Sequence, residues 1–269
     1  MAADRAPTRR GALAFLRALI ATNQRAARAK RGAFWMQVVF MVGNNSIFWT
    51  VWILFFERFE SIGGWRLREL SALFGIVAIA HGIGVILAGG VRSLARKIAE
   101  GELDALLAQP RDPLVYAIGS ETMPSGWGDV ASGLFLVTLA APASAGAWAA
   151  VAVGALAGAV IVVATAVLFQ SLAFWAGPVD GFARQAWDVV ITFSVYPQTI
   201  YAGAIRVLLF TVIPAGFIGY LPVEAMRDPR ASTLLAIVAA ALAYATLARL
   251  VFRAGLRRYA SGSRMHAGI

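Results

Sequence analysis

The fold is decided by residues 130–179, which read VASGLFLVTLAAPASAGAWAAVAVGALAGAVIVVATAVLFQSLAFWAGPV. This run of fifty residues contains no Asp, Glu, Lys or Arg. As one helix it would be roughly 75 Å long, more than twice the ~30 Å hydrocarbon core of a bilayer. A turn signal, PASAG at residues 142–146, lies near its middle. The run therefore predicts two membrane-spanning helices joined by a tight hairpin.

The composition of the whole chain agrees with a membrane protein. Apolar residues make up 59% and charged residues 14%, whereas soluble proteins carry roughly a quarter of charged residues. Residues 33–56 and 70–91 contain no charged side chain and are long enough to cross a bilayer. Residues 231–252 are interrupted only by Arg249, whose long side chain can reach the membrane surface. We expect an all-α integral membrane protein whose single transmembrane domain covers residues 1–269.

The segment from residue 189 to residue 223 is ambiguous, because Arg206 divides it and three prolines, at positions 197, 214 and 222, punctuate it. If the segment crosses once and the amino terminus is inside, 18 of the 24 basic residues lie inside, as the positive-inside rule requires. A seventh crossing would place the basic carboxyl-terminal tail outside. We therefore predict six spans with both termini cytoplasmic and a re-entrant helix pair on the outer face at 204–222. The expected spans are residues 33–56, 70–91, 124–142, 149–176, 187–203 and 231–252.

Residues 11–31 predict an amphipathic helix ahead of the first span. At about 100° per residue, leucines 13, 16 and 19 fall on one arc with Ile20 and Ala27, while four arginines and Gln24 fall on the other. Such a helix lies in the cytoplasmic interface as an anchor, and it could also contact a cytosolic partner. A twin-arginine signal at Thr8–Arg10 is disfavoured, because Arg17 interrupts the apolar run that should follow it.

The formal charge of +10 is concentrated at the flanks of the spans. This placement indicates membrane orientation and attraction to anionic membrane lipid. Nucleic-acid binding is therefore not expected.

Residues able to carry chemistry are few. The chain has no cysteine and two histidines, and it contains neither a P-loop nor a G-x-S-x-G motif. We expect no catalytic residue, no metal site and no cofactor in this chain. No acidic residue lies at the centre of an expected span, which disfavours an ion-coupled carrier.

Two polar features fall inside expected spans. Asn44, Asn45 and Ser46 lie at the midpoint of the first span, and His81 lies near the middle of the second. The first three either hydrogen-bond between helices or line a translocation path. His81 is either a hydrogen-bonded packing residue or part of a proton relay.

The inside loop, residues 92–123, contains the sequence GELDALLAQP at residues 101–110. Its glycine and proline bracket a short helix, and its two acidic residues lie in the first turn, where they complement the helix dipole. Its three leucines, at positions i, i+3 and i+4, form one apolar stripe. Such a stripe either docks in the groove of a partner or packs back on the spans of the same chain.

This G-E-L-D-x-L-L-x-x-P loop resembles the signature between the second and third spans of ABC type-2 exporter permeases. The resemblance is to the compact six-span subfamily encoded beside a separate ATPase. Further segments match in the same order: FESIGGW at 59–65, YP at 196–197, VIP at 212–214 and YLP at 220–222. The likeness covers roughly residues 35–260, and short re-entrant helices before the sixth span are usual in these permeases.

The resemblance implies that the loop forms a coupling helix seated in a cleft of the ATPase, and that the amino-terminal helix touches the same partner. Carried over by position, the coupling residues are Gly101, Glu102, Leu103, Asp104, Leu106, Leu107 and Pro110.

The resemblance also implies a transmembrane subunit of an ATP-driven exporter that moves a hydrophobic or amphipathic substrate outward. ATP and Mg would be bound by a separate P-loop ATPase, and the partners would include a second permease, identical or related. The expected location is a bacterial cytoplasmic (inner) membrane. The alternatives are a small carrier or channel without an ATPase and a scaffold subunit without transport activity.

Overall fold

The computed structural model describes residues 9–109, 111–201 and 203–259, so Pro110 lies outside the described residues. Within these ranges the regular structure is helical, apart from one isolated antiparallel bridge between Ile62 and Trp65. The longer helices are α1 (Arg9–Ala29), α2 (Arg31–Phe56), α3 (Leu67–Ala88), α7 (Ser125–Ala140), α8 (Ala145–Ser171), α10 (Asp180–Val195) and α13 (Ala231–Leu256). The shorter ones are η1 (Gly89–Ser93), α4 (Leu94–Ala99), α5 (Leu103–Leu107), α6 (Pro113–Gly119), α9 (Ala173–Ala176), η2 (Gln198–Ile200), α11 (Ala204–Leu208), the π-helix η3 (Gly216–Tyr220) and α12 (Leu221–Arg227).

In the described part of the chain, four helical stretches are long and apolar enough to cross a membrane: Arg31–Phe56, Leu67–Ala99, Ala145–Ala176 and Ala231–Leu256. They correspond to the expected first, second, fourth and sixth spans. The expected third and fifth spans coincide with α7 and α10, which have 16 residues each. A 16-residue helix is about 24 Å long and is shorter than the ~30 Å hydrocarbon core. The structure thus confirms the all-helical fold and supplies, within the described residues, four helices of spanning length.

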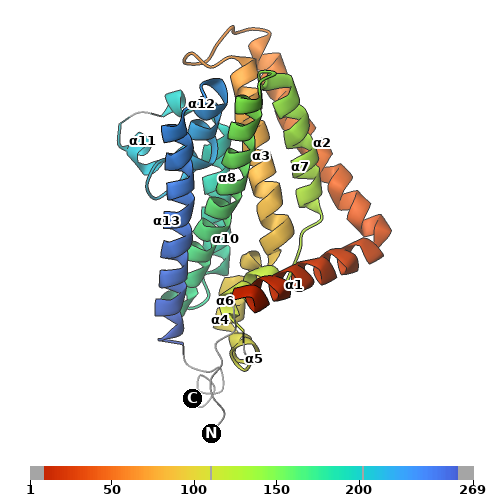
Figure 1. Ribbon diagram of the computed structural model, residues 1–269, viewed down its shortest axis with the longest axis vertical. Coiled ribbons are helices and arrows are strands. Elements are labelled where there is room, and N and C mark those ends of the chain that lie inside the picture. Colours follow the sequence, from red (N-terminus) through yellow and green to blue (C-terminus); the bar gives the residue numbers. More distant parts are fainter. Residues whose placement is uncertain (1–8, 110, 202, 260–269) are drawn as a thin grey trace.

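The long helices run side by side along the longest axis of the molecule (Figure 1). Helix α1 crosses one end of this bundle, where α4, α5 and α6 also lie, and we call this the basal end. Helices α11 and α12 and the connection between α2 and α3 lie at the opposite, distal end.

Helices α3 and α7 are packed backbone against backbone. A Cβ atom added to Gly82 of α3 would lie 2.6 Å from the carbonyl oxygen of Gly126, and one added to Gly75 would lie 2.8 Å from that of Gly133. The two glycines of each helix are seven residues, or two turns, apart, so they share one face. Small residues at such a crossing allow helices to approach closely in a membrane. These two contacts fix the register of α3 against α7.

Helix α10 ends at Val195, whereas the sequence interpretation extended the fifth span to residue 203. Tyr196 has extended backbone angles (φ −103°, ψ 145°), as expected for a residue before proline. Pro197 has no N–H to donate to the carbonyl of Phe193, four residues earlier. The Tyr220 hydroxyl donates to that carbonyl instead, at 2.7 Å.

The segment expected to be re-entrant contains short helices. From Gly216 to Arg227, η3 and α12 form a continuous helical stretch that packs against α8 and α3. Pro222 lies against Gly154 of α8, where an added Cβ atom would be 2.6 Å from the proline ring. Most of this stretch is buried, as irregular helix would have to be if it lay at membrane depth.

Helix α1 is held across the basal end by polar contacts. Asn23 donates to the carbonyl of Gly119 at 2.7 Å, and Gln24 donates to the hydroxyl of Thr122 at 2.6 Å and to the carbonyl of Ile86 at 3.2 Å. The sequence pattern placed Gln24 on the solvated arc. It is half-buried instead, because the end of α3 and the connection between α6 and α7 offer polar groups that its amide can bond.

Candidate functional sites at the basal end and inside the bundle

The loop expected to couple to an ATPase is a folded unit at the basal end. Gly101 links α4 to α5 with a φ of +79°, a conformation that favours glycine. Asp112 caps α6 by accepting from the backbone N–H groups of Leu114, at 3.0 Å, and Val115, at 3.4 Å. The loop therefore presents α5 in one defined orientation.

The three leucines of α5 have different environments. Leu103 is fully buried in the hydrophobic core, and Leu106 is half-buried against that core. Leu107 is 42% exposed. Leu103 therefore packs on the chain itself, whereas Leu107 faces outward, and docking of the stripe in a partner stays a prediction.

Ionic contacts join α5 to its neighbours. Arg96 of α4 donates to Glu100 at 2.8 Å and to Glu102 at 2.7 Å. Beyond the end of α13, burial and the neighbouring Asp104 carboxylate raise the pKa of the Tyr259 hydroxyl to about 12. Asp104 therefore interacts with Tyr259, just past the end of α13. The loop around α5 thus contacts both α4 and the chain that follows α13.

Helix α4 is attached to α8 through the fully buried side chain of Gln170. The backbone N–H of Ala95 donates to Oε1 of Gln170 at 2.8 Å. Nε2 of Gln170 donates to the carbonyl of Arg92 at 3.4 Å. One amide thus satisfies backbone groups on both sides of the junction between η1 and α4. A movement of α4 must displace α8 or break these bonds.

A second constellation lies inside the bundle, where α2, α3 and α7 meet. The Asp129 carboxylate is 6% exposed, accepts from Nδ2 of Asn45 at 2.9 Å and lies 3.1 Å from Nδ1 of His81. A carboxylate buried in apolar surroundings is costly unless it is paired and hydrogen-bonded. Asn45 and His81 supply these partners, one to each oxygen.

Aromatic contacts extend this cluster toward the basal end. The His81 ring lies 5.5 Å from the ring of Trp187 on α10, and the Arg92 guanidinium lies 4.9 Å from the centre of a ring of the same side chain. Arg92 is the residue whose carbonyl Gln170 holds. The buried cluster and the basal loop are therefore connected through one residue.

A cavity of about 610 Å³ opens beside the cluster. Phe48, Phe74 and Tyr196 form part of its apolar wall. Its polar lining residues are Asn44, Asn45, His81, Arg92, Asp129, Asp188 and Thr192. It offers charges of both signs together with aromatic surface, which suits the polar part of an amphipathic molecule.

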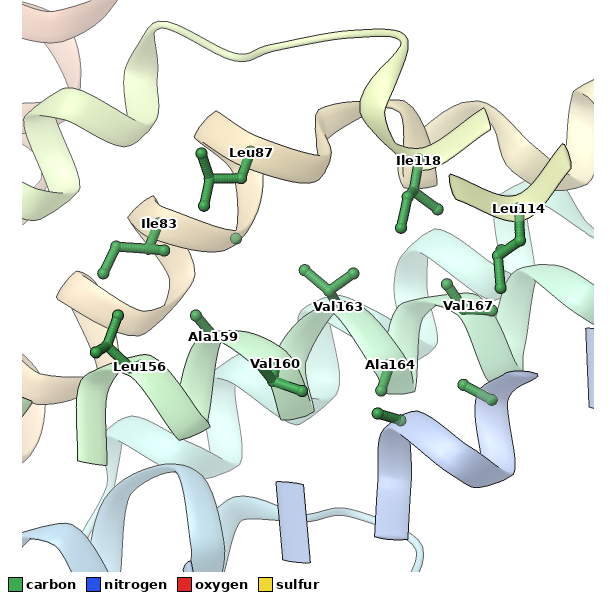
Figure 2. Close-up of a pocket in the computed structure, with 13 residues that line it drawn as sticks. Ile83, Leu87, Leu114, Ile118, Leu156, Ala159, Val160, Val163, Ala164 and Val167 are labelled. Atoms are coloured by element: carbon green, nitrogen blue, oxygen red, sulfur yellow. The ribbon is translucent and has the colours of Figure 1, made fainter. Parts of the chain in front are cut away.

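A different cavity, of about 420 Å³, lies between α3, α6, α8 and α13. Figure 2 shows Ile83 and Leu87 of α3, Leu114 and Ile118 of α6, and Val163 of α8 around it. All of its lining side chains are hydrocarbon. It can accommodate only apolar matter, whereas the 610 Å³ cavity also offers charged and hydrogen-bonding groups.

Of the four polar residues that the sequence singled out within the expected spans, the structure brings only some together. Asn45 and His81 meet at Asp129, and Asn44 lines the adjacent cavity. Ser46 instead donates to the carbonyl of Val42 in its own helix, at 2.7 Å. Among the described residues, no group of three or more His, Asp or Glu side chains is arranged to hold a metal ion.

The sequence interpretation missed Asp129, Arg92, Asp188 and Gln170. Asp129 fell near the start of the expected third span and received no role there, although the glycine spacing in the expected second and third spans carried a usable signal. Gly75 packs against Gly133 and Gly82 packs against Gly126, and this register places Asp129 level with His81. A Cβ atom added to Gly82 would lie 2.9 Å from the Cβ of Asp129.

Replacing Asp129 by leucine is expected to lower stability by about 1–3 kcal/mol, because the Asn45 amide and the His81 ring would lose a buried partner. The thermal unfolding midpoint of the detergent-solubilised chain measures this. Asp228→Leu is the matched control, because Asp228 is paired with Arg230 at an exposed site, where ion pairs contribute little. Equal midpoints for the two variants would show that the cluster does not stabilise the bundle.

These features define a polytopic α-helical membrane protein with a polar cavity between its helices. The chain belongs to the ABC-2 family transporter proteins, whose family model matches residues 42–263. It is thus a membrane component of a transporter and is not itself catalytic. Comparison with curated proteins and with solved structures finds no match.

Proposed function

We propose that this chain is the transmembrane subunit of an ATP-driven exporter that works with a separate P-loop ATPase, which binds ATP and Mg. The observation that carries the proposal is the exposed Leu107 at the end of α5, on a folded loop within the family-matched region. An exposed apolar side chain on a rigidly held helix suits insertion into a partner's groove.

The contacts of the basal loop suggest how movement reaches the cargo. ATP binding closes the ATPase dimer and displaces α5, which Arg96 ties to α4. Helix α4 then acts on α8 through Gln170, and Arg92 carries the displacement to Trp187 and His81. Such a chain of packed and hydrogen-bonded groups can move the walls of the polar cavity. Export of a hydrophobic or amphipathic substrate through that cavity is the proposed outcome.

The proposed topology has six spans, with α7 and α10 as the third and fifth, and places the basal end and both termini in the cytoplasm of a bacterium. The 18 of 24 basic residues that this topology puts inside support it. The buried η3–α12 stretch would be the re-entrant part in the outer half of the membrane.

A second permease, identical or related, completes the proposed transporter. Helix α2 supports this, since only 17% of the most apolar part of the helix is buried within the chain. Large apolar side chains on it, among them Met36, Val39 and Phe40, are largely exposed. Lipid and a second permease are the surfaces that would cover them.

Affinity purification of the chain from its native host in mild detergent, followed by mass spectrometry, tests the proposal. We expect a P-loop ATPase in near-stoichiometric amount, and a second permease if the assembly is heteromeric. Recovery of the chain without an ATPase, even after crosslinking, would favour the alternative of a small carrier or channel.

A further inference from the structure

A groove at the basal end lies apart from both cavities described above. It has a volume of about 950 Å³ and runs between the end of α1, the start of α2 and the first turns of α7. Three arginines, Arg25, Arg28 and Arg31, line one part of it, and the remaining walls are apolar or aromatic. No acidic residue lines the groove.

The positive charge of this groove is uncompensated in the described part of the chain. None of the eight ion pairs found there involves Arg25, Arg28 or Arg31. Local sequence offers no partner either, because residues 5–56 contain eight basic residues and no Asp or Glu. Guanidinium groups gathered without a carboxylate favour an anion, and their forked donors match the oxygens of a phosphate.

The other half of the groove is suited to hydrocarbon. Phe34 and Val38 of α2 form a buried part of its wall, and Ala131 of α7 lies opposite. Both helices belong to the membrane-embedded bundle, and α2 is of spanning length. Trp35 and Trp127 line the groove and are 61% and 37% exposed; tryptophan is enriched at membrane interfaces.

The arginines are positioned by folded structure. The Arg28 guanidinium lies 5.7 Å above the ring of Trp127, and the indole N–H of Trp127 donates to Oε1 of Gln24 at 3.3 Å. Gln24 is in turn bonded to Thr122 and Ile86. The α1 end of the groove is therefore anchored to α7 and to the end of α3.

We infer that this groove binds one anionic phospholipid from the adjoining leaflet, with its phosphate at Arg25, Arg28 and Arg31 and an acyl chain along Phe34, Val38 and Ala131. A lipid joins a negative head group to a hydrocarbon tail, as the two halves of the groove require. An acidic protein surface could meet the arginines but could not follow the apolar half into the membrane. The inference is independent of the proposed partnership with an ATPase.

Native mass spectrometry of the purified full-length chain, titrated with dioleoyl phosphatidylglycerol or dioleoyl phosphatidylcholine, tests this site. We expect a first phosphatidylglycerol to bind in preference to phosphatidylcholine. The triple variant Arg25→Gln, Arg28→Gln, Arg31→Gln should weaken phosphatidylglycerol binding roughly tenfold to a hundredfold, since each basic residue near an anionic surface contributes about a fivefold factor. The control Arg253→Gln, Arg257→Gln, Arg258→Gln makes the same change in net charge and should retain the preference.

Ala131→Trp provides a second variant that keeps all three arginines. Ala131 is exposed in the groove, so the indole should fill the apolar half and displace the lipid without disturbing the fold. Equal binding of the two lipids to the wild-type chain, or unchanged phosphatidylglycerol binding in both groove variants, would overturn the inference. So would binding of glycerophosphate as tight as that of the lipid. An arginine variant that keeps its lipid but no longer recovers an ATPase would assign the arginines to a protein partner instead.

Discussion

Leucine in place of Gly82 is expected to abolish accumulation of the folded protein. A Cβ atom there would lie 2.6 Å from the carbonyl oxygen of Gly126, and backbone cannot rotate away as a side chain can. Overpacking usually costs about 1–3 kcal/mol, and we expect the upper end or more, because α3 and α7 would have to separate. That separation would also pull Asp129 from His81 and Asn45. Monodisperse recovery of a fluorescent fusion by size-exclusion chromatography measures the effect.

Gly43→Leu is the matched control for this substitution. Gly43 is also in the interior of a long helix, but nothing lies within 4 Å of a Cβ atom added there. Leucine is the better helix former by roughly 0.5–1 kcal/mol, so this variant should fold as well as the wild type. Normal recovery of Gly82→Leu would show that the close α3–α7 crossing is not required.

Aspartate at position 107 is expected to separate the chain from its proposed ATPase while leaving the fold intact. Leu107 is 42% exposed, and surface substitutions of this kind usually change stability by about 0.5 kcal/mol or less. In a partner's apolar groove, however, the same carboxylate would be buried without a partner. Loss of a central anchor costs about 2 kcal/mol or more, roughly a thirtyfold drop in affinity. Recovery of the ATPase with the affinity-purified variant measures this loss.

Two controls separate coupling from folding. Leu103→Asp places its charge in the core, where the wild-type leucine is fully buried, and should lose folded protein altogether. Phe59→Asp changes an exposed apolar residue in the connection between α2 and α3, at the distal end, and should bind the ATPase normally. Wild-type recovery of the ATPase by Leu107→Asp would remove α5 from the proposed interface.

Long apolar segments were the predictable part of this fold. The charge-free stretches around Asn45, His81 and Gly154 became long helices, because in a bilayer the backbone must satisfy its own hydrogen bonds. Family membership was also visible, since the loop at residues 101–110 and the later proline motifs resembled the family that the match to residues 42–263 identifies.

Tertiary packing decided what the sequence left open. Periodicity places Leu103 and Leu107 on one stripe, but only packing against the core buries the first and exposes the second. Counting charges along the chain assigned Asp129 no partner, although Asn45 and His81, from two other helices, hold it in the interior. The end of α10 depended on Pro197 together with the distant hydroxyl of Tyr220.

Site-directed crosslinking from α5 tests the central claim most directly. The chain contains no cysteine, so Leu107→Cys introduces a single thiol, and Phe59→Cys provides a matched one at the distal end. With a thiol-to-amine crosslinker in native membranes, the account predicts an adduct with the ATPase from position 107 and none from position 59. Absence of an adduct from position 107 in membranes that contain the ATPase, or equal adducts from both positions, would contradict coupling through α5.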